Sequence, residues 1–358
     1  MRKNLFATTP GIIIVGAVIG LIAVWLQKLG NPANMGICVA CFERDVAGGL
    51  GLHRAAIVQY LRPEIMVLGS LAAAIATREF KPRGGSAPIV RFVLGMIAAM
   101  GALVFLGCPW RAILRLAGGD GNAILGLAGL ATGIWFGTLF FKKGYSLGRS
   151  SQSVASGALF PVIAVCLLLL YLIFPQIPDQ PQSGPLFYSV KGPGSQHAPF
   201  IASLGLAFII GIFAQRSRFC TMGAFRDLFL FRYTHLFLGL AAMFAAAFIA
   251  NALTGGLKFG FEGQPVAHSD FLWNYLGMVT AGLAFALAGG CPGRQLFMAG
   301  EGDSDAGIFA LGMLVGAAMA HNLGTASSGT GIGVYGMQAT IIGFAVCLII
   351  GFVHSKKA

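Results

Sequence analysis

The chain has 358 residues, of which 56% are hydrophobic and only 10% are charged, and its formal net charge is +12. Soluble domains contain about 25% charged residues, so this composition excludes an ordinary soluble protein and leaves no room for a separate soluble domain. Apolar runs of about 17–25 residues, the length that crosses a bilayer core, recur along the chain. The positive charge is therefore read as a topology signal and not as a nucleic-acid surface.

In chain order, the sequence predicts an all-α polytopic membrane protein with about ten spans. The 52 glycines fit such a bundle, because small residues let helices pack closely in lipid. No small-residue cleavage site follows the first apolar run, so we expect that run to be a span and not a signal peptide. The expected spans are 11–27, 62–78, 89–107, 122–141, 157–174, 199–215, 235–253, 271–289, 305–322 and 337–353.

Basic residues are concentrated in alternate connections between these spans. Segments 78–91, 142–149 and 216–232 are rich in Arg and Lys, and so are the two ends, with Arg2, Lys3, Lys356 and Lys357. The loops 176–198 and 323–336 hold only Asp179 and Lys191 as charged residues. Because cytoplasmic loops of membrane proteins carry an excess of Lys and Arg, we expect both termini on the cytoplasmic side of a bacterial inner membrane.

The second half of the chain repeats motifs of the first half at an offset of about 182 residues. The matching residues are Cys38 with Cys220, Arg44-Asp45 with Arg226-Asp227, His53 with His235, and GCPWR at 107–111 with GCPGR at 290–294. Each half has five expected spans, an odd number, so the second copy would cross the membrane in the opposite sense. This predicts two inverted-topology repeats, 1–175 and 199–358, joined by an external linker at 176–198.

Four short segments are too polar to span the membrane and too apolar to be plain loops. They are 38–61, 108–117, 217–232 and 292–299. We expect each to be a half-helix that dips into the protein, since irregular backbone at that depth is tolerated only where protein or a wet cavity covers it.

The repeated Gly-Cys-Pro-x-Arg turn has the pattern of a helix start. Its first helical positions hold, in the two copies, Cys108 and Cys291, Pro109 and Pro292, and Arg111 and Arg294. Cysteine would take the N-cap and proline the N1 position, where its missing N–H costs nothing. A helix N-terminus offers free N–H groups and a positive dipole end, which favour an anion. Soft sulfur beside these donors suits a small anion that contains sulfur or selenium.

The other cysteines admit more than one interpretation. Cys38 and Cys220 recur with the Arg-Asp pair, which favours a functional role. Cys38-Val-Ala-Cys41 is a CxxC motif, so either a redox dithiol or a structural thiol is possible there. No second Cys or His pair completes a zinc site, so we expect no metal. Cys166 and Cys347 lie in the middle of spans and are expected to pack in the core.

The remaining polar candidates are also open. Arg44 with Asp45, and Arg226 with Asp227, would be either buried ion pairs or ligand contacts. His53 and His235 are expected at helix ends. The acidic residues Glu301, Asp303 and Asp305 are expected in a solvated loop, with a docking patch for a soluble partner as the alternative.

These motifs resemble the YeeE/YedE family of membrane proteins, which take up sulfur species such as thiosulfate, and more closely its YedE-type selenium transporter subgroup. The resemblance runs through residues 31–45, 50–65, 105–122, 142–150, 216–236 and 289–296. It implies an hourglass-shaped fold whose central path is lined by Cys108, Cys220 and Cys291, with Cys38 as the symmetry mate of Cys220. It also implies a TusA-like cytoplasmic sulfur carrier as a partner, with segment 299–305 as its docking site.

Two functions follow as hypotheses. The first is a transporter for a sulfur- or selenium-containing anion, with no cofactor and no enzymatic activity. It is favoured by the repeat and by the lack of a P-loop or a G-x-G-x-x-G motif after a strand. The alternative is an integral-membrane thiol oxidoreductase that uses Cys38 and Cys41.

Overall fold

The structure is a computed structural model that describes residues 5–53 and 62–356. Within these residues, nine helical segments are long and apolar enough to cross a membrane, and the strands are only two residues long. The expectation of an all-α polytopic membrane protein is confirmed. Arg2, Lys3, Lys357 and residues 54–61, the end of the first expected half-helix, lie outside the described residues.

Every expected span corresponds to a helix whose ends differ from the expected ones by a few residues. The long helices are α1 (Thr9–Lys28), α3 (Arg62–Ala76), α4 (Pro88–Phe105), α6 (Asn122–Lys142), α7 (Val154–Ile173), α8 (Phe200–Ser217), α10 (His235–Leu253), α11 (Phe271–Ala288), α13 (Ser304–Asn322) and α14 (Gly336–Val353). Only α3 is shorter than a full span in its described part.

Four short helices correspond to the four predicted half-helices. They are α2 (Val39–Gly49), α5 (Pro109–Ala117), α9 (Thr221–Phe231) and α12 (Pro292–Gly300). Two antiparallel strand pairs lie in loops, β1 (Arg83–Gly84) with β2 (Ser151–Gln152), and β3 (Gln182–Ser183) with β4 (Leu186–Phe187). Single 3-10 turns occupy Leu5–Ala7 and Pro193–Ser195.

The order of long and short helices in α1 to α7 recurs in α8 to α14. The most extensive helix contacts are also exchanged between the two halves: α1 packs on α10 as α8 packs on α3, and α4 packs on α13 as α11 packs on α6. Each of these pairs joins one half to the other, so the halves interlock and do not form separate bodies. The last helices depart from this pattern, since α7 packs on α3 whereas α14 packs on α11 and α4.

Glycines bring the paired backbones into direct contact. A Cβ atom added at Gly16 of α1 would lie 1.9 Å from the carbonyl oxygen of Gly239 on α10, and one added at Gly95 of α4 would lie 2.2 Å from that of Phe309 on α13. No other residue fits at either position, which is how small residues act in membrane helix packing.

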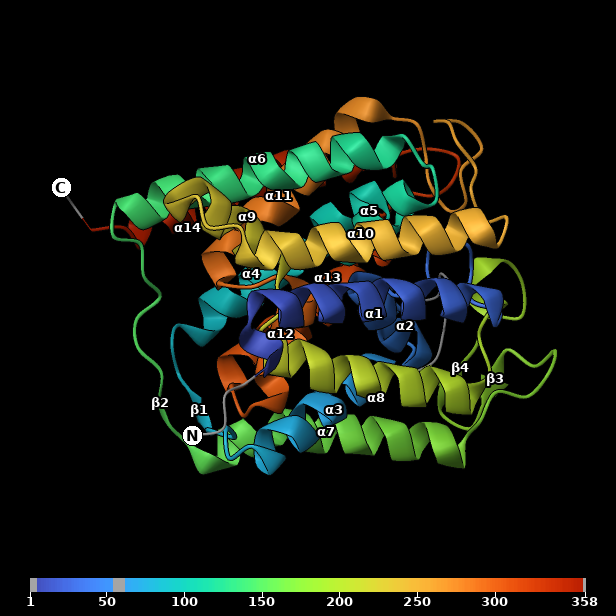
Figure 1. Cartoon of the computed structure of the whole chain (residues 1–358), viewed down its shortest axis with the longest axis horizontal. Helices are drawn as coiled ribbons and strands as arrows, with labels where there is room; N and C mark the ends of the chain where they lie inside the picture. The colour runs from blue at the N-terminus through green and yellow to red at the C-terminus, as the bar shows by residue number, and fades with distance from the viewer. Residues whose placement is uncertain (1–4, 54–61, 357–358) are drawn as a thin grey trace.

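The loops at the two ends of the bundle differ in charge. In Figure 1, α1 begins and α14 ends at the left end, which also holds β1, β2 and the short helix α9. The β3–β4 pair, from the charge-poor segment 176–198, lies at the right end. The described parts of the Arg- and Lys-rich segments therefore gather at one end of the molecule.

Candidate functional site: buried thiols at four helix starts

Each of the four short helices begins with a cysteine. The N-cap residues of α2, α5, α9 and α12 are Cys38, Cys108, Cys220 and Cys291, all with extended backbone angles. Cys38 Sγ accepts a hydrogen bond from the backbone N–H of Cys41 at 3.4 Å, and Cys220 Sγ accepts one from that of Gly223 at 3.2 Å. The N-cap positions predicted for the two Gly-Cys-Pro turns, with proline directly after the cysteine, are confirmed.

The N-termini of α2 and α5 meet in a group that we name the first thiol cluster, made of Cys38, Cys41 and Cys108. The Cys38 and Cys108 thiols lie next to each other and interact, and the backbone N–H groups of Ala40 and Arg111 lie close to the Cys108 sulfur. Cys38 Sγ lies 2.6 Å from Cys41 Sγ. Two helix N-termini therefore direct N–H donors at the same sulfur atoms.

The N-termini of α9 and α12 form the second thiol cluster, Cys220 and Cys291, in the same arrangement. These thiols lie next to each other and interact, and the backbone N–H groups of Thr221 and Arg294 lie close to the Cys291 sulfur. Gly223 stands where the first cluster has Cys41. The second cluster is thus a two-thiol version of the first.

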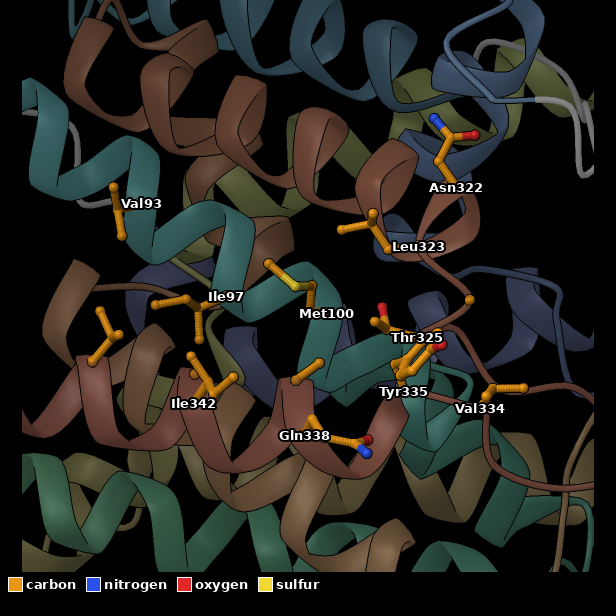
Figure 2. A pocket seen from close by; sticks show the side chains of 14 residues that line it. Val93, Ile97, Met100, Asn322, Leu323, Thr325, Val334, Tyr335, Gln338 and Ile342 are labelled. Atoms are coloured by element: carbon orange, nitrogen blue, oxygen red, sulfur yellow. The ribbon is translucent and has the colours of Figure 1, made fainter.

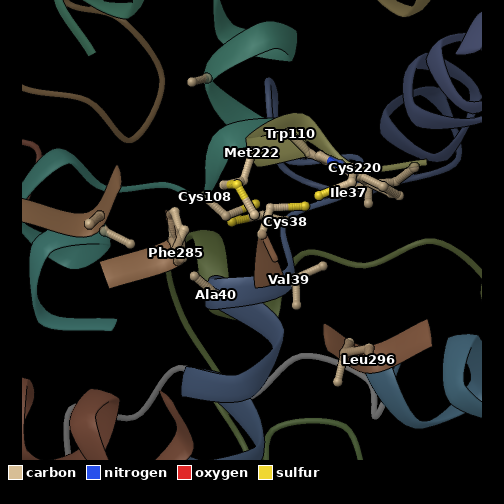
Figure 3. Packing of buried hydrophobic residues seen from close by; sticks show 14 of the residues in the cluster. Ile37, Cys38, Val39, Ala40, Cys108, Trp110, Cys220, Met222, Phe285 and Leu296 are labelled. Atoms are coloured by element: carbon tan, nitrogen blue, oxygen red, sulfur yellow. The ribbon is translucent and has the colours of Figure 1, made fainter. Parts of the chain in front are cut away.

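All five thiols of the clusters are buried, and Figure 3 shows Cys38, Cys108 and Cys220 among the apolar residues that enclose them. Cys220 keeps 6% of its surface exposed, and the other four keep 1% or less. Cys108 interacts with Cys38, and Cys291 with Cys220, so each interacts with the N-cap cysteine of the other short helix in its own half.

Trp110, the residue after Pro109, connects the two clusters. Its ring packs edge-on against Phe219 with centroids 5.5 Å apart, and against Phe297 at 5.9 Å. It also lies over Gly293, where an added Cβ would approach the indole Cζ2 to 3.2 Å. Since Phe219 directly precedes Cys220 and Gly293 follows Cys291 by two residues, this side chain of the first turn packs beside the second cluster.

The two arginines of the repeated turn have different partners. Arg111 is fully buried and donates to the carbonyl oxygens of Asn34 (3.3 Å), Val266 (3.0 Å) and Leu106, with Cys41 Sγ 3.8 Å from Nη1. Arg294 instead forms a buried ion pair with Glu301 at 3.1 Å. Both guanidinium groups stay beside the thiols, but protein atoms already accept most of their hydrogen bonds.

The Arg-Asp pairs are ion pairs between neighbouring residues of one helix. Arg44 and Asp45 lie 2.7 Å apart and are buried, whereas Arg226 and Asp227 lie 2.8 Å apart with the arginine side chain 37% exposed. The structure thus shows both ion pairs, the first of them buried, and a contact of these residues with a ligand stays a prediction.

The two histidines make no matching contacts. His53 is buried, donates from Nε2 to the Arg44 carbonyl oxygen at 2.9 Å, and stacks on His321. His235 starts α10, contacts Thr9 at 3.4 Å and stacks on Tyr233. The expected helix-end position holds for His235.

Two predictions about the surroundings of the site are wrong. The acidic segment is not solvated: Glu301, Asp303 and Asp305 are 3%, 8% and 2% exposed. Glu301 binds Arg294, and Asp303 binds Arg83 at 2.9 Å. Asp305 accepts hydrogen bonds from the backbone N–H groups of Gly85 and Ser86, in the loop before α4. Among the mid-span cysteines, Cys347 is buried as expected but Cys166 is exposed on the outer surface.

Sequence reasoning missed Trp110 and a buried pair behind it. Arg115 on α5 binds Asp120 at 2.6 Å, and both side chains are fully buried. The signal for Trp110 was present in the repeat, since GCPWR and GCPGR differ only at this position within an otherwise identical turn.

An apolar groove lies elsewhere, on the side of α4 and α14. It has a volume of about 830 Å³ and an apolar lining that includes Val93, Ile97, Met100 and Ile342, as Figure 2 shows. None of the residues that line it belongs to either thiol cluster, so we do not assign it to the same site.

The described residues hold no group of three or more His, Cys, Asp or Glu side chains placed to bind a metal ion. The chemistry of the site is instead that of weak S–H donors, backbone N–H groups and positive dipole ends, which together favour a polarisable anion. The fold and this interior define a polytopic α-helical membrane protein with thiols at its centre.

Comparison with known proteins shows which membrane proteins this chain resembles. Residues 216–351, which contain the second thiol cluster, match the family described as "Sulphur transport". The thiosulfate transporter TsuA of Spirochaeta thermophila is 32% identical over 106 residues, which cover 30% of this chain and 32% of that relative. The match thus spans about a third of the length of TsuA, and over the matched residues the resemblance to the YeeE/YedE family is confirmed.

Proposed function

We propose that this chain is a membrane transporter for a small sulfur-containing anion of the thiosulfate type, passed between the two thiol clusters. The proposal also includes the architecture: the chain consists of two inverted-topology repeats, and both termini lie on the cytoplasmic side of a bacterial inner membrane. The name of the relative, a thiosulfate transporter, and the sulfur-transport family support the substrate class. Selenium-containing anions of similar shape belong to the same proposal, because selenium is a soft chalcogen like sulfur.

The observation that carries the proposal is the repeated geometry of the thiols. Cys38 with Cys108, and Cys220 with Cys291, are neighbouring N-cap thiols at the N-termini of short helices. Each pair offers S–H groups for a terminal sulfur atom and a positive dipole end for the charge. One weak thiol contact after another suits transfer, because a tight site would hold the anion and slow its release.

A second candidate function, a thiol oxidoreductase, is favoured by the 2.6 Å contact between the Cys38 and Cys41 sulfur atoms. In that function the dithiol would be the reacting group, and Cys41 would be indispensable. In the transporter Cys41 stands beside the path and has no counterpart in the second cluster, so its removal should be tolerated.

The test is uptake of labelled thiosulfate by cells that lack their own sulfur-oxyanion importers. We expect Cys291→Ala to reduce uptake by about tenfold or more, since loss of a hydrogen bond to a charged group costs about 1.5–3 kcal/mol. Cys41→Ala should retain uptake, and labelled selenite and selenosulfate define the range of substrates.

Cys347→Ala is the matched control, because Cys347 is a fully buried cysteine outside both clusters. All variants are compared at equal membrane abundance. Uptake that survives Cys291→Ala and disappears with Cys41→Ala would reject the transporter path in favour of the oxidoreductase.

A TusA-like carrier stays a prediction of the resemblance. The segment 299–305 does not support it as the docking site, since the acidic side chains of this segment are buried and paired within the chain.

A further inference from the structure

Trp110 has an unsatisfied hydrogen-bond donor at the centre of the protein. Its side chain is 1% exposed, and its Nε1 atom has no hydrogen-bond partner. Native structures leave few buried polar groups unpaired, and each costs about 1–3 kcal/mol. A donor kept in this state beside two thiol clusters indicates a ligand that supplies the missing acceptor.

A second unsatisfied group lies on the other side of Cys291. Thr221 is fully buried, and its hydroxyl oxygen has no partner. Its backbone N–H reaches the Cys291 sulfur, while the Trp110 ring lies over Gly293, two residues beyond Cys291. The indole N–H and the Thr221 hydroxyl therefore both flank the second cluster, and Figure 3 shows the indole nitrogen on the side of Trp110 that faces Cys220.

The position of Trp110 is possible only because the repeat is asymmetric. Its counterpart in the second half is Gly293, and the indole occupies the space above that glycine, within 3.3 Å of an added Cβ at both Cζ2 and Cε2. Two tryptophans at these positions would compete for the same volume. The first Gly-Cys-Pro turn thus supplies the indole of Trp110, and the second supplies, at Gly293, the space that this indole fills.

We propose that Trp110 is both the barrier between the two clusters and, with Thr221, the binding site for the oxygen atoms of the passing anion. This deepens the proposed function and rests on it. The ligand class is a tetrahedral oxyanion with one soft chalcogen atom: its oxygens accept from the indole N–H and the hydroxyl, and its terminal sulfur or selenium faces the thiols. Sulfate, which has the oxygens but no soft atom for the thiols to bind, is stopped at the Trp110 barrier.

The first experiment measures binding to the purified full-length protein in detergent. With Trp25, Trp135 and Trp273 replaced by Phe, Trp110 is the only tryptophan left. Thiosulfate should change its fluorescence in a saturable manner, and sulfate should not. Trp110→Phe in the otherwise native chain keeps an aromatic ring but removes the donor, and calorimetry should show an affinity for thiosulfate about tenfold lower.

Trp135→Phe is the control, because Trp135 lies on α6 with 45% of its surface exposed and should bind as the native chain does. Gly293→Ala should also lower thiosulfate uptake by wedging a methyl group under the indole. Trp110→Leu opens the barrier with a smaller apolar side chain and should admit sulfate into cells, which the native chain rejects.

The outcomes separate the two proposals. If the native chain takes up thiosulfate and Trp110→Phe binds and transports it equally well, the role of Trp110 is rejected and the transporter stands. If the native chain neither binds nor takes up thiosulfate, selenite or selenosulfate, the proposed function fails and this inference fails with it. Variants that elute as folded protein on gel filtration but lose thiosulfate affinity support the inference.

Discussion

The two thiol clusters have the same backbone arrangement and differ in the side chains that surround it. Both consist of two short helices whose N-cap cysteines lie next to each other and interact. The first cluster adds a third thiol, Cys41, and the barrier Trp110, while the second has glycines at 223 and 293. The duplicated scaffold thus keeps the anion-binding helix starts, and single residues give each copy its own task.

The charged surroundings differ in the same way. Arg111, in the first copy, donates mainly to backbone carbonyl oxygens. Arg294, in the second copy, pairs with Glu301, which also lies 3.7 Å from Arg218, and Arg218 reaches Glu79 at 3.6 Å. Backbone carbonyl oxygens therefore fix Arg111 in place, whereas Arg294 belongs to a network of side-chain ion pairs.

The largest effect is expected at the two aspartates that follow α5 and α12. Within residues 5–53 and 62–356, Asp120 is the sole carboxylate partner of the fully buried Arg115, whereas Asp303 pairs with Arg83, whose side chain is 31% exposed. Asp120→Asn leaves a buried charge unpaired and should destabilise the protein by about 3–5 kcal/mol. Asp303→Asn should cost about 1 kcal/mol or less. Thermal unfolding in detergent measures both, and equal losses would contradict the contrast.

A smaller change should make the second cluster resemble the first. Gly223→Cys restores the CxxC spacing, and its Cβ would lie 3.4 Å from Cys220 Cβ, with only the flexible end of Leu236 closer, at 3.1 Å. After treatment with diamide, which oxidises thiols to disulfides, we expect the native chain to lose two of its seven free thiols and the variant to lose four of eight.

Thiol counting by alkylation of the denatured protein and mass spectrometry gives the readout. Gly223→Ser, similar in size but without a thiol, should behave as the native chain. If Gly223→Cys lost no more than two thiols, the two clusters would differ in more than the presence of Cys41.

The smallest effect concerns Glu79, in the loop after α3. Burial opposes its charged form, but hydrogen bonds from Gln215 and Arg216 outweigh burial and lower its pKa below the usual 4.5. A lowered pKa stabilises the folded state above the unfolded-state pKa, and this stabilisation is lost as pH falls below about 4.5 through the folded-state value. Because the side chain is 34% exposed, the contribution is at most about 1 kcal/mol.

The matching variant is Glu79→Gln, compared with the native chain by thermal unfolding at pH 7 and at pH 4. The native protein should lose slightly more stability between these two pH values than the variant does. The same loss in both would remove Glu79 from the ion-pair network of the second cluster.

Most of the fold was predictable because apolar length alone determines a span, and the repeat located the breaks between spans. The helix starts at Cys108 and Cys291 were predictable for a local reason, since proline at N1 leaves few alternatives. Partner choice was not predictable. The sequence does not say that Cys108 neighbours Cys38, or that Asp303 and Asp305 turn inward, because their partners, Arg83 and the backbone N–H groups that follow it, are distant in sequence. Nor does it say that Glu301 turns back to pair with Arg294 across α12.

The glycine contacts between the halves bear on how the protein can move. At the α1–α10, α3–α8, α4–α13 and α6–α11 crossings, backbone meets backbone at positions such as Gly16, Gly69, Gly95 and Gly129, each with a carbonyl oxygen of the facing helix within 2.2 Å of an added Cβ. A rocking movement of one half against the other would separate the backbones at all four crossings and would lose their dispersion contacts together. The helix bundle is therefore expected to stay rigid during transport. Gating would then come from the movement of single side chains such as the indole of Trp110.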